Sequence, residues 1–475
     1  MVFSSLLFVY LFLPLCLLLY FLVKDIRARN LILLLFSLIF YAWTNPKYII
    51  LLVVMVFINW GCAVGIDSNG RRRVKKRWLI LDLVGSFGVL GVFKYLGFAS
   101  SILQSITGFP AEIIRIALPI GISFYTFQLV SYTIDVYRGE IRAERNFFIV
   151  LLYAGMFHQC IAGPIVRYQD VAEEIDYRVI DSDELSKGVT RFAVGLAKKT
   201  LLANTCAKVF DTLVPMDSIG SCSALALWIG MAFFMFQIYL DFSAYSDMAI
   251  GMGLMTGFHF RENFNYPYVG TSITDFWRRW HISLSSFFRD YLYIPLGGNR
   301  CGKARQIFNL FVVWFLTGLW HGASWNYVLW GLFFFVFLVI EKTFLLDILE
   351  SIPKAFGHIY MVIVVFFGWI IFKFEDLGVM GTVFKGMFCG NGNPFTTYET
   401  GTVFLNYIFF FILCIVAVTP LLKNVSYILT RLGDKYKGIL IFKSVIDVAA
   451  PVVLLALSTM ALVGNSYNPF LYFQF

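Results

Sequence analysis

The sequence has little charge, and its cysteines and histidines are too scattered to build a metal site or a disulfide framework. Only 14% of the 475 residues are charged, against about a quarter in soluble domains. The 8 cysteines include no CxxC pair, and there are only 5 histidines. No P-loop or Rossmann glycine pattern occurs either. Both absences argue against ATP-driven transport and dinucleotide redox chemistry.

Apolar residues, by contrast, are abundant. They make up 59% of the chain, and aromatic residues alone make up 19%. A soluble globule, a disordered chain and a secreted disulfide scaffold all fit this composition poorly. The formal net charge of +9 comes from basic residues in short clusters between apolar runs, as the positive-inside rule places them. We therefore expect a multi-pass membrane protein in contact with lipid, and no nucleic-acid partner.

Apolar runs long enough to cross about 30 Å of hydrocarbon occur from one end of the sequence to the other. They predict an all-α integral membrane protein of about eleven transmembrane spans, with one or two re-entrant or short helices. Residues 1–475 are expected to form a single domain, since no internal repeat is evident. Residues 2–23 are uncharged and are interpreted as a retained first span rather than a signal peptide. Basic loops at 24–29 and 71–77 should be cytoplasmic, which predicts an N-terminus outside. The expected spans lie at 2–23, 30–43, 48–66, 78–98, 116–134, 218–240, 306–340 as a pair, 355–372, 402–422 and 448–473. A further helix is expected at 190–210, an apolar segment at 248–258 that continues into a polar block, and a broken segment at 146–166.

His321 is the first candidate for chemistry. It lies inside the uncharged run 306–340, which is too long for one ordinary span, in the sequence TGLWHGASWN at 317–326. Ionisable groups at membrane depth are costly and are functional candidates by default. Trp320 and Asn326 of the same sequence are candidate supporting residues. The alternative is a helix-end histidine that hydrogen-bonds to a carbonyl group.

His281 is the second candidate, in a basic and aromatic block at 275–305. Arginines interleaved with aromatic rings could hold a phosphorylated donor such as coenzyme A. The alternative is a cytoplasmic loop whose arginines contact lipid phosphates. The candidate donor-binding residues are Trp277, Arg278, Arg279, Trp280 and Arg289.

Two acids, Asp241 and Asp247, follow a long apolar run and form a third group. They could orient a histidine or relay protons, but we favour a structural role at the end of a span. His158, close to Gly163 and Pro164, is expected to line the broken segment 146–166. A neutral histidine, an attacking hydroxyl and a thioester donor need no metal, so these elements suit acyl transfer to an alcohol.

Four ordered sequence motifs resemble the membrane-bound O-acyltransferase family, in particular its alginate O-acetyltransferase branch. Residues 3–15 and 467–470 also look like that branch, so the resemblance covers essentially the whole chain. The region from 239 to 331 contains the signature. The motifs are HQCIAGPIVRYQDV at 158–171, YLDFSAYSDMAIG at 239–251, DFWRRWHISLSSFFRDYLYIPLGGNR at 275–300 and GLWHGASWNYVLWG at 318–331.

The resemblance implies a funnel-shaped helical bundle in the bacterial cell membrane. It implies that an acetyl group passes from a cytoplasmic thioester, with acetyl-CoA as a substrate rather than a permanently bound cofactor, to an extracytoplasmic acceptor. The family's essential histidine maps onto His321 and its second histidine onto His281. A separate extracytoplasmic protein with an SGNH-esterase-type domain is expected to pass the group to hydroxyls of an exported or cell-surface polysaccharide.

Two other functions remain open at this point. A sister branch transfers D-alanine from a carrier-protein thioester to teichoic acid, and the sequence IPLGGNR at 294–300 looks more like the acetyl branch. A transporter or polysaccharide export factor could use His321 and Asp241 as a proton relay. Transporters often contain paired halves with discontinuous helices, and no such pairing is evident here.

Overall fold

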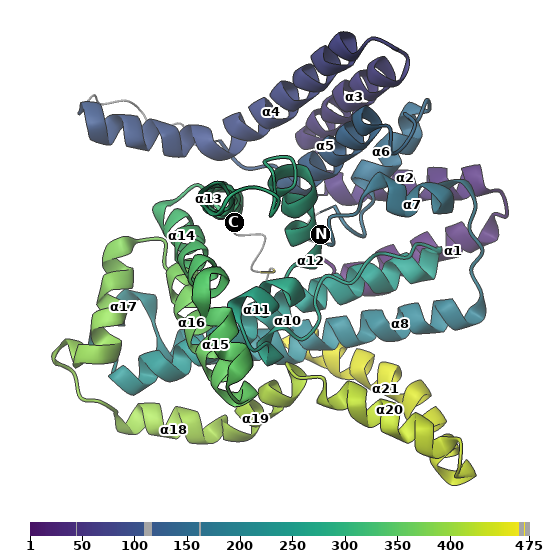
Figure 1. Cartoon of the computed structure of the whole chain (residues 1–475). Helices are drawn as coiled ribbons and strands as arrows, with labels where there is room; N and C mark the ends of the chain where they lie inside the picture. Colours follow the sequence, from purple (N-terminus) through teal and green to yellow (C-terminus); the bar gives the residue numbers. More distant parts are fainter. Residues whose placement is uncertain (44, 109–115, 161–162, 465–469, 471–475) are drawn as a thin grey trace.

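The computed structural model describes residues 1–43, 45–108, 116–160, 163–464 and 470. Within these residues the regular structure is helical and contains no strand, which confirms the all-α membrane fold (Figure 1). Of the motif at 467–470 and the last part of the span expected at 448–473, only Phe470 lies within the described residues after position 464.

The first half of the chain forms two groups of helices, drawn at the top and at the right of Figure 1. α3 packs against both α4 and α5, and α8 packs along α10. The sequence predicted a loop at 71–77 and a span at 78–98, but α4 is helical over the whole stretch. The bounds are η1 Phe8–Phe12, α1 Leu13–Leu22, α2 Ile26–Ala42, α3 Lys47–Asp67, α4 Arg72–Thr107, α5 Ile122–Arg138, α6 Phe147–Gly155, α7 Tyr168–Asp176, α8 Ser182–Ala197, η2 Lys198–Ala203, α9 Asn204–Leu213 and η3 Met216–Ser221.

α10 is one continuous helix, Ala224–Thr256, although the sequence predicted two segments separated at residues 241–247. The polar residues do not end the helix, because their charges are neutralised by a neighbouring element. Lys199 Nζ lies 2.6 Å from Asp241 Oδ1, and Lys198 Nζ lies 2.6 Å from Asp247 Oδ2. A paired carboxylate can remain inside a helix that is otherwise apolar.

The uncharged run 306–340 forms two helices, as predicted, with the break directly after His321. α13 and α14 pack so closely that a methyl group has no room at two glycines. A Cβ atom on Gly318 would lie 2.4 Å from the Tyr327 carbonyl oxygen, and one on Gly331 would lie 2.4 Å from the carbonyl oxygen of Trp314. Elements in this part are η4 Pro267–Val269, α11 Ile273–Arg279, α12 Ile282–Phe288, η5 Arg289–Tyr293, α13 Lys303–His321, α14 Trp325–Ile340, η6 Glu341–Leu345 and α15 Leu346–Ser351.

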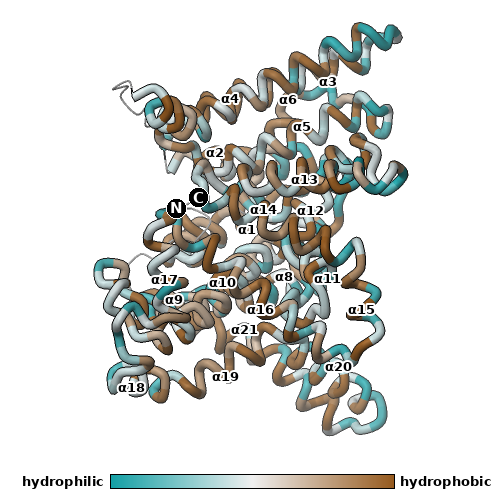
Figure 2. The backbone as a smooth tube through the Cα atoms, turned by 60° about the vertical axis from the view of Figure 1, so that its left-hand side comes forward, coloured by the Kyte–Doolittle hydropathy of each residue, from teal (hydrophilic) through white to brown (hydrophobic). Residues whose placement is uncertain are grey.

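The C-terminal part begins with α16, which packs on α14 and α10, and ends in a hairpin of α20 and α21 that projects from the rest of the chain (Figure 1). Many large apolar side chains are exposed on the outside of the helices, and Figure 2 shows how hydrophobic residues are distributed along the backbone. The bounds are α16 Lys354–Lys373, α17 Leu377–Cys389, η7 Gly390–Gly392, α18 Tyr398–Asn406, α19 Ile408–Ala417, α20 Leu421–Gly433 and α21 Lys437–Gly464.

By length and composition, 5 described helices can cross a membrane: α3, α4, α10, α16 and α21. The number rises to 6 if the pair α18 and α19, bent by 53°, forms one span. Several other apolar helices are shorter or interrupted, for example α13 and α14. The protein is therefore a multi-pass membrane protein, and the figure of about eleven spans stays a prediction.

Candidate active site

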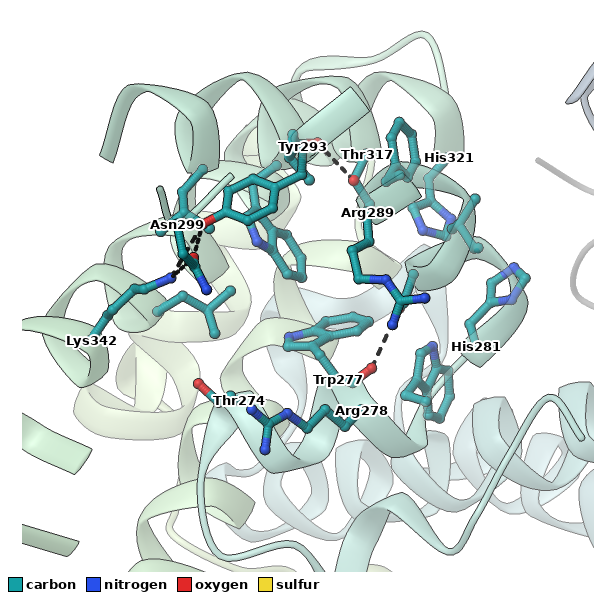
Figure 3. Close-up of a pocket in the computed structure, with 18 residues that line it drawn as sticks. Thr274, Trp277, Arg278, His281, Arg289, Tyr293, Asn299, Thr317, His321 and Lys342 are labelled. Atoms are coloured by element: carbon teal, nitrogen blue, oxygen red, sulfur yellow. Dashed lines mark hydrogen bonds between the residues drawn. The ribbon is translucent and has the colours of Figure 1, made fainter. Parts of the chain in front are cut away.

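Both candidate histidines line one pocket of about 300 Å³, a volume at the lower end of the range for small-molecule sites (Figure 3). The pocket lies between α11, α12 and η5 on one side and α13, α14 and η6 on the other. Two sequence motifs therefore converge on the same space and contribute His281 and His321, which lie 40 positions apart in the sequence. The predicted residues in the lining are Trp277, Arg278, Trp280, His281, Arg289 and His321.

His321 is the last residue of α13, and α4 holds that end of the helix. The last carbonyl groups of a helix have no partner within it and need one from elsewhere. Lys94 Nζ donates a hydrogen bond to the Trp320 carbonyl oxygen, and the Tyr95 hydroxyl donates to the Leu319 carbonyl oxygen at 2.7 Å. α4 therefore fixes the position of the backbone from which the His321 side chain extends.

Aromatic rings surround the imidazole of His321, which is only 4% exposed. Trp330 and Trp320 lie edge to face with it at centroid distances of 4.8 and 4.9 Å, and Phe372 lies at 5.4 Å. Such packing excludes water and restricts the ring to a narrow set of orientations. The side chain is therefore buried and held in place, as a group that acts on a bound substrate must be.

His281 lies between α11 and α12, with its backbone in the left-handed region at φ 45° and ψ 55°. That conformation is uncommon for a residue other than glycine. The ring is 1% exposed and lies edge to face with Phe242 at 4.7 Å and with Trp320 at 5.8 Å. Its Nδ1 lies 3.1 Å from Asn263 Oδ1. Trp320 contacts both imidazoles, so the two histidine side chains pack against the same indole ring.

Three cations line the pocket: Arg278, Arg289 and Lys342. Lys342 Nζ donates to Asn299 Oδ1 at 3.0 Å, and Figure 3 shows this pair on the opposite side of the pocket from the histidines. Arg289 also pairs with Asp290 at 2.7 Å. Burial raises the pKa of the Asp290 carboxyl, but hydrogen bonds and charge from Arg289 and Arg167 outweigh it and hold that pKa below the ordinary value. The pocket therefore carries positive charge among aromatic, aliphatic and small polar side chains.

A buried acid, Glu341, holds the helix that carries the donor-binding candidates. Its carboxylate accepts hydrogen bonds from the backbone amides of Ile273 and Thr274, at 2.5 and 2.8 Å. A carboxylate at the first turn of a helix satisfies free amide groups and interacts favourably with the helix dipole. Glu341 thereby anchors the start of α11, from which Trp277 and Arg278 extend into the pocket.

Other residues that the sequence suggested lie away from the pocket. Arg279 pairs with Asp275 at 2.9 Å and does not belong to the lining. His158 stacks on Phe157, at 4.1 Å, after the end of α6. Asn326 donates to backbone carbonyls at the end of α16. The remaining two, Asp241 and Asp247, form the ion pairs with lysines that keep α10 continuous.

Four residues near the site were not found from the sequence: Lys94, Asn263, Glu341 and Lys342. Lys94 was the one with a visible signal, because it interrupts the apolar run 78–98 and a charge at that place is costly. Glu341 and Lys342 are the first charged residues after the run 306–340, so in the sequence they indicate only where the apolar run ends. Asn263 carries no charge, and its contact with His281 depends on tertiary structure.

Comparison with known proteins agrees with this geometry. The profile of the membrane-bound O-acyltransferase family matches residues 139–383, which include both histidines. The chain is 38% identical to "Probable alginate O-acetylase AlgI" of Azotobacter vinelandii over the whole of both chains. It is 33% identical to the peptidoglycan O-acetyltransferase of Helicobacter pylori, over 82% of this chain and 80% of that one. The teichoic acid D-alanyltransferase of Bacillus subtilis is 26% identical over 47% of this chain and 59% of its own length.

The protein is thus a multi-pass helical membrane protein in which two buried histidines line one pocket. The chain belongs to the membrane-bound O-acyltransferase family and is an O-acyltransferase.

Proposed function

We propose that this enzyme takes an acetyl group from a cytoplasmic thioester, acetyl-CoA, and passes it across the membrane for O-acetylation of an exported or cell-surface polysaccharide. The observation that supports this best is the pocket, in which Figure 3 shows Lys342 on the opposite side from the two buried histidines. Coenzyme A has the matching layout, because its phosphates are separated from its thioester by a long, largely uncharged arm. Arg278 and Lys342 would bind the phosphates as charge-assisted partners.

The reaction needs one proton transfer and no metal. The acceptor hydroxyl oxygen attacks the thioester carbonyl carbon, and His321 takes the hydroxyl proton as general base. The carbon–sulfur bond then breaks, and the thiolate leaves as the free thiol after it receives that proton. His281, on the same pocket, would orient the acyl group near the donor entry. The products are an acetyl ester and coenzyme A, so atoms and charge balance.

The names of the relatives support acetyl transfer to a surface polymer over D-alanyl transfer. The A. vinelandii relative matches this chain from end to end, and the D-alanyltransferase matches less than half of it. The proposal also includes a separate extracytoplasmic protein with an SGNH-type domain, which would place the group on sugar hydroxyls. The proposal also keeps the N-terminus outside, as the basic loops at 24–29 and 71–77 predict.

The test compares ester-linked groups that mild alkali releases from the surface polymers of wild-type and His321→Ala cells. General-base catalysis contributes about 10²- to 10⁴-fold, so acetate should fall to background in the variant while the protein still inserts into the membrane. His259→Ala is the matched control, because His259 is 52% exposed in its side chain and lies outside the pocket. Acetate at the wild-type level in His321→Ala cells would contradict the proposal, and selective loss of D-alanine would establish the sister activity instead.

A further inference from the structure

Asn263 lies in the segment between α10 and α11 and is fully buried. It does not belong to the pocket lining, but it contacts His281, which does. A buried amide side chain in contact with a candidate catalytic imidazole can determine which ring nitrogen carries the proton. The hydrogen bonds around Asn263 settle that question.

The orientation of the Asn263 amide follows from its neighbours. Its Oδ1 lies 3.2 Å from the backbone nitrogen of Ser283 and 2.9 Å from the Ser283 hydroxyl. A backbone amide can only donate, so the atom that faces it must be the carbonyl oxygen. On the other side, Asn263 Nδ2 donates to Ser246 Oγ of α10 at 3.2 Å. Both contacts require the same orientation of the amide.

The same oxygen lies 3.1 Å from His281 Nδ1. A carbonyl oxygen can only accept, so the hydrogen of this bond must be on Nδ1. The hydroxyl of Ser283 lies 3.4 Å from Nδ1, but its own hydrogen points to Asn263 Oδ1 at 2.9 Å. A neutral imidazole that carries its hydrogen on Nδ1 has its lone pair on Nε2.

Asn263 also fixes the backbone of the left-handed turn at His281. Its carbonyl oxygen accepts from the backbone amide of Ile282 at 2.9 Å, while its side chain accepts from the next amide, that of Ser283. A left-handed residue other than glycine persists only where its surroundings hold it. One residue therefore secures both the conformation and the hydrogen position of His281.

We propose that Asn263 is a positioning residue that holds neutral His281 with its hydrogen on Nδ1, so that Nε2 is the basic nitrogen of the ring. The proposal rests on the proposed function, since it takes His281 as part of the acyl-transfer site. Asn263 acts through His281 and does not itself line the space where the substrate binds.

The first experiment is the pH dependence of acetyl transfer by Asn263→Asp in lipid nanodiscs. A carboxylate at this position accepts the same hydrogen but favours the charged imidazolium, so the acidic limb should move to higher pH by about one unit or more. The other groups of the pocket with acid–base chemistry are Arg278, Arg289, Tyr293, His321 and Lys342. None of these changes in the variant.

Asn265→Asp is the matched control, because Asn265 is exposed and lies two positions further along the chain. It introduces the same charge without the contact to His281, and its acidic limb should coincide with that of the wild type. Asn263→Leu removes the acceptor altogether, so kcat should fall by about tenfold or more while KM for the donor changes little. At a pH above the shifted acidic limb, Asn263→Asp should regain the kcat that Asn263→Leu loses. This result would show that the hydrogen bond to His281, and not packing alone, accounts for the effect of Asn263.

A second measurement does not depend on whether the Asn263 variants fold. Nitrogen NMR of ring-labelled histidine in the wild-type protein, assigned with His281→Gln, should show the Nδ1–H form of His281. A dominant Nε2–H form overturns the inference. An unchanged acidic limb in Asn263→Asp overturns it as well. Full transfer activity in His281→Ala instead contradicts the role that the proposed function gives to His281, whatever Asn263 does.

Discussion

Charged residues are used in opposite ways at the interface that α8 and η2 form with α10 and at two cations of the pocket wall. At the interface, Asp241 meets Lys199 at 2.6 Å, and Asp247 meets both Lys198 and Arg191. On the pocket wall, neither Arg278 nor Lys342 has an ion-pair partner within the part of the chain that the structure describes. The charges at the interface neutralise one another, whereas the positive charges of Arg278 and Lys342 can interact with an anionic ligand.

This difference separates structural charge from functional charge better than burial does. A buried charge is tolerated when a partner and hydrogen bonds compensate for the loss of water. A cation that faces a cavity without a partner gains most when an anion binds. Asp241 and Asp247 are therefore expected to stabilise the helix bundle, whereas Arg278 and Lys342 are expected to bind an anionic ligand in the pocket.

The largest effect should come from breaking the paired region. Asp241→Ala leaves Lys199, which is only 2% exposed, without its carboxylate, and loss of one partner of a buried pair costs about 3–5 kcal/mol. A large fall in Tm in detergent is expected. The Asp447→Ala variant breaks the exposed Lys443–Asp447 pair in α21 and should change Tm little.

A double variant sharpens this test. When Lys199→Met is added to Asp241→Ala, the lysine charge that lost its carboxylate is removed as well, so much of the lost Tm should return. If the double variant is no more stable than Asp241→Ala, the neutralisation of charge at the interface of α8 and η2 with α10 is not what stabilises α10.

The next effect concerns the packing that places His321. Gly318→Ala puts a methyl group 2.4 Å from the Tyr327 carbonyl oxygen, so α13 must move away from α14. Overpacking of this kind costs about 1–3 kcal/mol, and the displaced histidine should lower kcat. Gly302→Ala is the matched control, because no atom lies within 4 Å of its added methyl group. Equal kcat in the two variants would show that the close approach of the helices does not position the site.

A smaller effect should distinguish the two neighbouring arginines of the pocket motif. Arg278 lines the pocket, whereas Arg279 is paired with Asp275 outside it. A charge-assisted hydrogen bond to a donor phosphate contributes about 1.5–3 kcal/mol, so Arg278→Ala should raise KM for acetyl-CoA by about tenfold or more. Steady-state kinetics of Arg279→Ala should give a KM close to that of the wild type. If both variants have the same KM, the arginines of the basic block at 275–305 do not bind the donor, and the alternative that they contact lipid phosphates is favoured.

The smallest effect lies at His259, whose ring bridges two acids. Its Nδ1 lies 2.7 Å from Glu174 and its Nε2 lies 3.1 Å from Glu184. Although burial lowers the pKa of His259, the hydrogen bonds to both glutamates outweigh it and raise that pKa above the ordinary value. The stability from this bridge is therefore fully present below the ordinary pKa of about 6.5 and is lost as the pH rises through the raised one.

Because His259 is half exposed, the change in stability should stay below about 1 kcal/mol. Thermal unfolding at a series of pH values should show a slightly lower Tm above the raised pKa in the wild type. In His259→Asn, this part of the pH dependence should disappear. If the pH dependence of Tm is identical in the two proteins, the contact of His259 with the two glutamates does not cause it.

Much of the site was predictable because rare groups in apolar runs stand out. His321 in an uncharged run and His281 in a basic aromatic block both line the pocket, and the break after His321 follows from the length of that run. The continuity of α10 was not predictable, because the ion pairs that allow it join residues more than 40 positions apart. Asn263 was missed because it carries no charge and its contact with His281, 18 positions further along the chain, depends on tertiary structure.

The central claim is that one pocket holds the thioester donor with its phosphates at the cations and its acyl group at the histidines. The most direct test is a cryo-electron microscopy structure in nanodiscs with a non-hydrolysable thioether analogue of acetyl-CoA. The account predicts that the analogue occupies the pocket, with its phosphates beside Arg278 and Lys342 and its acetyl end beside His321. An analogue bound elsewhere on the protein, or bound here in the reverse orientation, would contradict it.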